Sequence, residues 1–390
     1  MGTDWNLIEL TDLGVLRFRG AEAVKFLQGQ VSNDLEKLSP EQSQLAGYHN
    51  PQGRAIALLR LVQLAPDDVL ALLPRELTSP VATRLGKFVL RTKVKIADES
   101  AGWRVVGLAA PFAGTVGNGG ASAGPADEAE FERRAASWAA AQFAQASVAA
   151  SAAGERSSAA AQLEEVDSVV ELPTASALML PDALNSVSRS DGTAIVRVGT
   201  APARWLMVSP VGEALPLSGC AAGTREAWRL LDIAAGVAQV YAATSEEFVA
   251  QMLNLDALGG ISFEKGCYTG QEVIARAHYR GRVKRRMQRF RSRGAVRLAV
   301  GESGQLADGR TFKVVDAALL TDGRCEFLAV APMVVGSAGE LADLASGGAA
   351  APSGRETVSA GAGASAEGEV PTRSAPLDAE VLPMSYPLPE

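Results

Sequence analysis

Cysteine, histidine and aromatic residues are scarce in this sequence, and each shortage excludes a class of protein. Among 390 residues there are three cysteines and two histidines, and aromatic residues make up 5%. Cys220, Cys267 and Cys325 are odd in number and far apart, which argues against a disulfide framework or a zinc ribbon. No apolar run is long enough to cross a bilayer, and the first residues lack the basic and apolar blocks of a secretory signal. We therefore predict a cytoplasmic protein with no membrane contact and no stably bound metal.

One stretch, residues 261–286 (ISFEKGCYTGQEVIARAHYRGRVKRR), organises the rest of the chain. Cys267 lies between Gly266 and Gly270, so the backbone there can turn tightly and approach a ligand closely. Thr269 and Glu272 have the spacing of a capping box, which predicts that a helix begins at residue 270 or 271. The stretch therefore places a thiol just before the amino-terminus of a helix.

These features predict that Cys267 is a reactive thiol. The positive end of the helix dipole favours a thiolate, and the neighbouring cation Lys265 acts in the same direction. We therefore take Cys267 and Lys265 as the candidate catalytic residues. The alternative is that Cys267 is an inert small apolar residue, which is the usual role of a lone cysteine. The two glycines, the cation and the helix start favour the reactive thiol.

A basic block follows the cysteine. The net charge is −7, yet residues 273–293 contain nine arginines and lysines and no acidic residue. The part from Arg280 to Arg286 is a candidate contact for an anion, either the carboxylate tail of a small molecule, a phosphate or RNA. The alternative is a solvated strand whose arginine stems cover apolar surface. In the sequence, aromatic residues are not interleaved with these charges as they are in a single-strand stacking platform.

The first half of the chain predicts an α+β unit over residues 1–110. Residues 15–19 alternate as a strand does, and residues 21–28 show helical spacing. A turn at residues 50–53 joins two strands as a hairpin, and a further strand, a helix over 76–89 and a strand over 93–96 follow. This β-α-β-β-α-β order is typical of a ferredoxin-like unit. Residues 111–165 are rich in Ala, Gly and Ser and predict a partly disordered insertion, in which 131–153 has the composition of an Ala-rich helix.

The second half predicts another α+β unit over residues 166–282, which faces the first. Thr224 is expected to cap a helix that carries Trp228 and ends before Gly236. Thr244 and Glu247 form a second capping box, which predicts another helix. Residues 283–390 show short apolar runs at 285–290, 295–300, 310–315, 325–330 and 382–388, which predict a small β-barrel interrupted by a disordered loop at about 337–376.

The central stretch also carries a family resemblance. The run KGCYTGQE, residues 265–272, resembles the signature of the YgfZ family of folate-binding proteins, and the similarity extends to residues 243–263 upstream and 275–285 downstream. Weaker matches lie at 26–34 and 50–54. This family is related to the T-protein (aminomethyltransferase) of the glycine cleavage system and to a mitochondrial iron–sulfur assembly factor. The resemblance implies a fold of two facing α+β units and a carboxy-terminal barrel.

The resemblance also implies a ligand and partners. Tetrahydrofolate would be the ligand, with Trp228 at the corresponding place lining the folate site and with Tyr268, Gln271 and Glu272 as further cofactor-binding candidates. For an isolated tryptophan, core packing is the alternative. Iron–sulfur enzymes or assembly factors would be the partners, with a downstream effect on tRNA modification. A single cysteine cannot hold an iron–sulfur cluster alone, so any ligation of a cluster needs a second chain.

Two departures from the family pattern bear on the chemistry. Residues 53–59 of the first hairpin contain no carboxylate, so the acidic residue that the T-protein uses for one-carbon transfer has no counterpart. Related proteins often have Glu, the pterin partner, where Ala234 stands, and Asp232 two positions away is expected to face elsewhere. We therefore predict a tetrahydrofolate-binding protein that assists iron–sulfur cluster assembly or repair and is not a functional aminomethyltransferase. The alternatives are a folate-independent scaffold for iron–sulfur or RNA partners and, less favoured, aminomethyl transfer.

Overall fold

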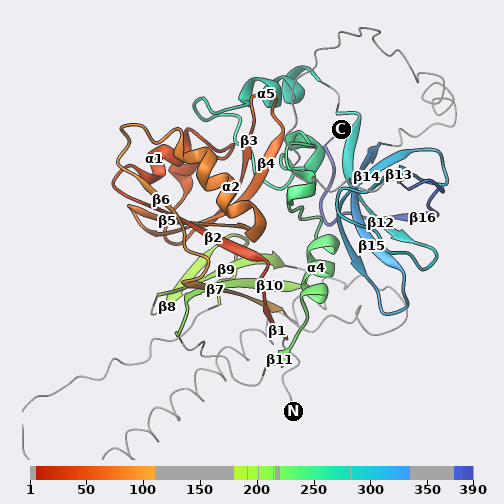
Figure 1. Ribbon diagram of the computed structural model, residues 1–390, viewed down its shortest axis with the longest axis horizontal. Coiled ribbons are helices and arrows are strands. Elements are labelled where there is room, and N and C mark those ends of the chain that lie inside the picture. Colours follow the sequence, from red (N-terminus) through yellow and green to blue (C-terminus); the bar gives the residue numbers. More distant parts are fainter. Residues whose placement is uncertain are drawn as a thin grey trace, which may run out of the picture.

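The computed structural model describes residues 6–109, 180–333 and 373–389, apart from 191, 201, 214, 216–219 and 282. Three β-sheets and a small number of short helices make up this part of the chain (Figure 1). The predicted α+β class is therefore confirmed. The predicted helix at 131–153, the insertion at 111–165 and most of the loop at 337–376 lie outside the described residues, and the predicted domain boundaries stay predictions.

The first sheet is five-stranded and antiparallel. Its order is β3 (Gln44–His49), β4 (Ala55–Ala65), β5 (Asp68–Pro74), β2 (Leu13–Arg19) and β6 (Lys95–Asp98). Strand β4 is a long apolar run buried on both faces. Helices α1 (Ala23–Gln28) and α2 (Arg75–Gly86) pack on the sheet in one core cluster, and the strands of the second sheet pack against Val62 and its neighbours in another. The short 3₁₀ turn η1 (Leu35–Lys37) follows α1. The predicted hairpin at residues 50–53 is confirmed. The predicted ferredoxin-like unit is not confirmed, because that unit has four strands and this sheet has five.

The second sheet joins strands from both sides of the insertion. Its order is β11 (Ala221–Ala222), β1 (Asn6–Glu9), β7 (Trp103–Ala109), β10 (Ala203–Pro210), β9 (Thr193–Thr200) and β8 (Val187–Ser190). Strands β1 and β7 come from the first predicted unit and the other four from the second. Hydrogen bonding thus links the two halves of the chain within one sheet, which sequence periodicity cannot show.

The third sheet holds the carboxy-terminal strands and lies to the right in Figure 1. Its order is β13 (Ser303–Gln305), β14 (Thr311–Leu319), β15 (Cys325–Pro332), β12 (Arg285–Ser292) and β16 (Ala379–Leu382). In the described part of the chain no ladder joins β13 to β16, so the predicted closed barrel is not confirmed. The run at 295–300 does not form a strand, and β16 begins and ends earlier than the predicted closing strand.

Two helices, α4 (Arg225–Ala234) and α5 (Gln271–Arg280), lie in the chain between the last strand of the second sheet and the first strand of the third sheet. Helix α4 begins as predicted, because the Thr224 hydroxyl accepts a hydrogen bond from the Ala227 amide, and the chain leaves it through Gly236 at φ 64°. Helix α5 also begins where expected. Its cap is Gly270 at φ 84° with no side-chain hydrogen bond, so the predicted capping box is wrong and the left-handed glycine takes its place.

The helix predicted from Thr244 does not form. The described chain there contains only the 3₁₀ turns η2 (Ala242–Thr244) and η3 (Ala250–Leu253). Between them the backbone runs alongside the first hairpin, since the Ala55 amide donates to the Phe248 carbonyl and the Glu246 amide donates to the Ala55 carbonyl. Pairing with the start of β4 therefore outweighs the local helix signal.

The contact between Gly107 of β7 and the Trp228 ring gives a test of this packing. A Cβ atom at residue 107 would lie 2.4 Å from Cε3 of Trp228. We expect Gly107→Ala to lower the free energy of unfolding by about 1–3 kcal/mol, because the ring has to move. Urea unfolding would measure the change.

The matched control is Gly86→Ala at the end of α2, where an added Cβ meets nothing within 4 Å. This variant should be neutral or slightly stabilising, because alanine restricts the unfolded chain. Equal destabilisation by both substitutions would contradict the proposed contact.

Candidate functional site

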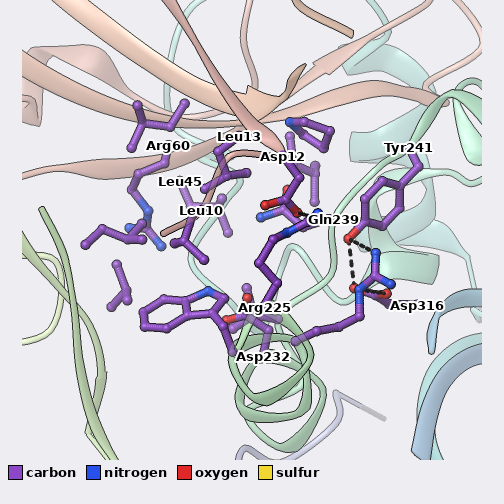
Figure 2. A pocket seen from close by; sticks show the side chains of 18 of the residues that line it. Leu10, Asp12, Leu13, Leu45, Arg60, Arg225, Asp232, Gln239, Tyr241 and Asp316 are labelled. Carbon is purple, nitrogen blue, oxygen red and sulfur yellow. Dashed lines mark hydrogen bonds and ion pairs between the residues drawn. The ribbon is translucent and has the colours of Figure 1, made fainter. Parts of the chain in front are cut away.

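A cavity lies where the three sheets meet beside helix α4 (Figure 2). Its volume is about 180 Å³, which is below the roughly 300–1,000 Å³ of pockets that enclose drug-sized ligands. It therefore suits one ring system rather than a long molecule. Its wall combines apolar side chains with charged ones, the main members being Leu10, Leu13, Leu45, Leu58, Leu72, Asp12, Arg60, Arg225, Asp232 and Asp316.

Helix α4 presents an aromatic ring and a carboxylate to this cavity. Trp228 and Asp232 are four residues apart, so they lie on one helix face, and both line the cavity. The Trp228 side chain is also 6% exposed and packs against the backbone of Gly107. Trp228 thus belongs to the core and to the cavity wall at once. The expectation that Asp232 faces elsewhere is wrong, because its spacing from Trp228 decides its direction.

A buried ion pair holds the carboxylate in place. Nη1 of Arg204 lies 2.5 Å from Oδ1 of Asp232, and the Arg204 side chain is 1% exposed. The same guanidinium lies 5.3 Å from the centroid of the Trp228 ring. Gly199 on the neighbouring strand leaves the space, since a Cβ there would lie 2.7 Å from Nε of Arg204. Ring, cation and carboxylate are therefore fixed relative to one another.

A second arginine reaches the cavity from the first sheet. Arg60 lies on β4, and its Nη1 donates to Oδ1 of Asn185. Burial lowers the pKa of Arg60 to about 10, although the charge of Asp232 opposes this shift. Burial also raises the pKa of Asp232, against the charges of Arg204 and Arg60. Arg204 and Arg60 thus both interact electrostatically with the Asp232 carboxylate. Because one carboxylate cannot occupy every N–H group of two guanidinium groups, some of these donors are available to a polar ligand.

The third sheet contributes a carboxylate on the opposite side of the cavity (Figure 2). Asp316 of β14 lies 3.1 Å from Nε of Arg229 and accepts a hydrogen bond from the Tyr241 hydroxyl at 3.1 Å. Burial raises the pKa of Asp316 to about 7 and also raises the pKa of Tyr241. This cluster connects the carboxy-terminal sheet to α4 through groups that are costly to leave unpaired.

The cysteine loop lies outside the cavity wall. Cys267 is exposed, and neither it nor Lys265 lines the cavity. The Lys265 ammonium donates to the carbonyl oxygens of Gln28, Val31 and Asn33 at 2.6, 2.7 and 2.8 Å. Its three N–H bonds are thus used to hold the loop against the turn after α1. Burial lowers the pKa of Lys265 to about 8.

The other predicted site residues accompany the loop. Tyr268 is 7% exposed with its ring centroid 5.2 Å from Nζ of Lys265, and burial raises its pKa to about 12. The Gln271 side chain donates to the Lys265 carbonyl at 3.4 Å, and Glu272 is exposed on α5. Of the six predicted site residues, Trp228 alone lines the cavity. The roles assigned to all six stay predictions.

The cavity residues missed in the sequence carried weak signals. Arg60 is a single charge within the apolar strand AIALLRLVQLA, and Asp316 is a single charge within VVDAALL. A lone charge in a buried strand needs a partner, and such partners lie at domain junctions. Asp232 could have been found from its four-residue spacing to Trp228. Tyr241 had no comparable signal.

The predicted basic block divides into two parts. Arg286 is 4% exposed and pairs with Asp256 at 2.9 Å, and Arg285 donates to Thr311 and to the Val330 carbonyl. Arg280 and Lys284 remain exposed. No helix in the described ranges is long and apolar enough to cross a membrane. The same ranges hold no group of three or more His, Cys, Asp or Glu placed to bind a metal ion.

Comparison with known proteins connects this arrangement to a family. The chain is 29% identical over 331 residues to the tRNA-modifying protein YgfZ of Yersinia pseudotuberculosis, with 83% of each chain covered. Its fold is similar to the crystal structure of the glycine cleavage system aminomethyltransferase T from Bartonella henselae, with a TM-score of 0.57, 15% identity and coverage of 85% of this chain and 79% of that one. No family model matches the chain. The resemblance drawn from residues 265–272 is confirmed, and the second likeness concerns the fold alone.

Asp316 provides a test of the charge cluster. Because its pKa is raised from 3.8 to about 7, the folded state holds the proton more tightly than the unfolded state does. Stability from this group is therefore fully present below about pH 4 and is lost as the pH rises through 7, by at most about 1.4 kcal/mol per pH unit. We expect Asp316→Asn to flatten the dependence of unfolding free energy on pH in this window, as measured by urea unfolding.

Asp322→Asn is the control, because Asp322 is an exposed carboxylate of the same sheet with a lowered pKa. It should leave the slope between pH 4 and 7 as in the wild type. Parallel curves for the wild type and Asp316→Asn would show that burial does not shift this carboxyl.

Proposed function

We propose, from the premise that this chain is a YgfZ-like protein, that it binds tetrahydrofolate in the cavity beside α4 and assists the assembly or repair of iron–sulfur clusters. The effect on tRNA modification would follow through an iron–sulfur enzyme. The similar Yersinia protein is described as tRNA-modifying, which supports this part of the proposal. The observation that carries the proposal is the pairing of an indole ring with a carboxylate on one face of α4 inside a closed junction of three sheets.

The cavity residues fit a pterin ring. Such a ring is flat, offers N–H donors on one edge and has a carbonyl acceptor beside them. The Trp228 ring supplies a flat apolar wall, and Oδ2 of Asp232 has no hydrogen-bond partner among the described residues. Asp232 can therefore accept from the N–H edge, while Arg60 can donate to the carbonyl. When bound, tetrahydrofolate supplies a carrier for one-carbon groups, and the chain's residues orient it and exclude water.

Asp232 takes the position that a carboxylate at residue 234 would be expected to hold. Ala234 is the last residue of α4 and does not line the cavity, whereas Asp232 does. A carboxylate two positions earlier thus meets the same need, because Arg204 fixes it from behind. This removes the objection that the pattern of residues 231–236 raised against pterin binding.

The first hairpin supports binding rather than aminomethyl transfer. Its cavity-lining residues are Leu45, Leu58 and Arg60, and residues 53–59 contain no carboxylate. Glu246 packs against the hairpin, but Asn50 donates to it at 2.6 Å and Arg84 pairs with it at 2.5 Å. It does not line the cavity. Proton transfer to a bound one-carbon group therefore has no candidate from this strand.

Cys267 would act outside the cavity, at the surface. An exposed thiol next to a helix start is accessible to a partner protein, where it can exchange with another thiol or hold an iron together with ligands of that partner. Lys265 would then be a positioning residue that anchors the loop. The alternative function is a folate-independent scaffold, in which the loop only shapes an interface.

Calorimetric titration with tetrahydrofolate tests the cavity. We expect the wild type to bind and Trp228→Ala to bind at least about tenfold more weakly, since loss of a stacked and buried ring costs more than about 1.4 kcal/mol. Asp232→Asn should also weaken binding, because the amide presents a donor where an acceptor is needed.

Trp205→Phe is the matched control, because Trp205 is a buried tryptophan of a separate core cluster. It should bind tetrahydrofolate as the wild type does. If the folded wild type does not bind tetrahydrofolate, the proposal of a folate site is wrong and the folate-independent scaffold remains.

Replacement of Cys267 distinguishes a function that needs a reactive thiol from a scaffold function that does not. In cells that lack the native protein, we expect Cys267→Ser to fail to restore iron–sulfur enzyme activity while still binding tetrahydrofolate, because the thiol does not line the cavity. Cys220→Ser, at a half-buried cysteine outside the loop, should restore activity at the same protein level. Full restoration by Cys267→Ser would favour the scaffold.

A further inference from the structure

Three aromatic rings gather on the outer side of helix α5. His278 stacks on Phe263 with ring centroids 3.8 Å apart and planes 14° apart. Tyr279 meets His278 edge-on at 4.8 Å and Phe263 edge-on at 6.0 Å. Phe263 comes from the cysteine loop and is half-buried, whereas His278 and Tyr279 are exposed, Tyr279 to 67%. The rings thus support one another and leave aromatic surface open to solvent.

Three cations neighbour His278 and Tyr279 along the chain. Arg276 and Arg280 lie one turn apart on α5, and Lys284 follows the helix. All three are exposed, and none forms an ion pair within the part of the chain that the structure describes. The exposed acids Glu264 and Glu272 belong to the loop and to the other end of the helix. We call Phe263, Arg276, His278, Tyr279, Arg280 and Lys284 the α5 platform.

The exposure of these side chains is unusual for the chain. Arginines that follow the platform are used inside the protein, as the buried pair of Arg286 with Asp256 shows. Tyr279 is one of a few large side chains with apolar surface left open. A ring exposed to 67% and three exposed cations that form no ion pair among the described residues, in a protein of net charge −7, indicate a surface kept for an anionic partner.

We propose that the α5 platform binds a single-stranded segment of RNA. His278 and Tyr279 lie between Arg276 and Arg280 in the sequence, so the expectation that no aromatic residue is interleaved with these charges is wrong. An unpaired base would stack on the exposed rings of Tyr279 and His278, and the adjoining phosphates would contact Arg276, Arg280 and Lys284. Combined stacking and phosphate contacts are the usual means of single-strand binding. A duplex would offer phosphates but no free base face. This proposal goes beyond folate binding, because no platform residue lines the cavity.

An acidic protein surface is the competing partner. It would use the three cations but has no flat ring system to cover Tyr279, whose open surface then stays unexplained.

Phe263 belongs both to the α5 platform and to the loop that carries Cys267. RNA on the platform would lie against the same loop that carries Cys267, so the two surfaces would be presented together.

Fluorescence anisotropy with a labelled oligouridylate, and with unfractionated tRNA as competitor, tests the proposal. We expect the full-length protein to bind, Tyr279→Phe to keep the affinity, and Tyr279→Ala to weaken it about five- to 150-fold, the equivalent of one stacked base. Arg280→Ala should reduce the slope of log affinity against log salt by about 0.7, as the loss of one phosphate contact does.

Arg324→Ala is the control cation: Arg324 is partly exposed in the turn between β14 and β15, away from α5. It should change neither affinity nor slope. Absence of binding by the wild type, equal weakening by Arg324→Ala, or equal affinity for a matched duplex would overturn the proposal. Tetrahydrofolate titration of Tyr279→Ala should match the wild type, so failure of RNA binding and failure of folate binding are separate results.

Discussion

The buried pair of Arg204 and Asp232 is the interaction on which the cavity depends. Arg204 enters from the second sheet and Asp232 from α4, and the guanidinium also lies over the Trp228 ring. Removing either charge would leave the other uncompensated in a buried site, which typically costs about 3–5 kcal/mol. The pair therefore fixes the distance between helix and sheet. The ring and the free carboxylate oxygen reach the cavity in one orientation for that reason.

The two predicted functional centres turn out to be separate. The cavity beside α4 is lined by charged and apolar side chains, whereas Cys267 is exposed on the loop that leads into α5. Lys265 explains the form of the loop, because its ammonium satisfies three carbonyl oxygens of the turn after α1.

Sequence reasoning succeeded where a local signal matched the tertiary environment. The start of α5, the Thr224 cap of α4 and the first hairpin were all predicted, and the motif at residues 265–272 indicated the family. It failed at Thr244, where backbone pairing with Ala55 replaced the helix that the capping-box pattern favours. It also failed at Asp232, whose direction followed from its four-residue spacing to Trp228. At Thr244 a partner distant in sequence decided the outcome, whereas at Asp232 a local spacing was overlooked.

What the sequence alone determined was the α+β class, the family resemblance and the presence of a glycine-flanked cysteine before a helix. These depend on residue type and on short spacings, which act within a few residues of the chain. The tertiary structure decided which strands share a sheet, that Lys265 binds carbonyl groups, that Asp232 lines the cavity and that Phe263 joins His278 and Tyr279. Burial and pairing of charges depend on contacts between segments up to two hundred residues or more apart, as Lys265 and Gln28 illustrate, and no local pattern encodes those contacts.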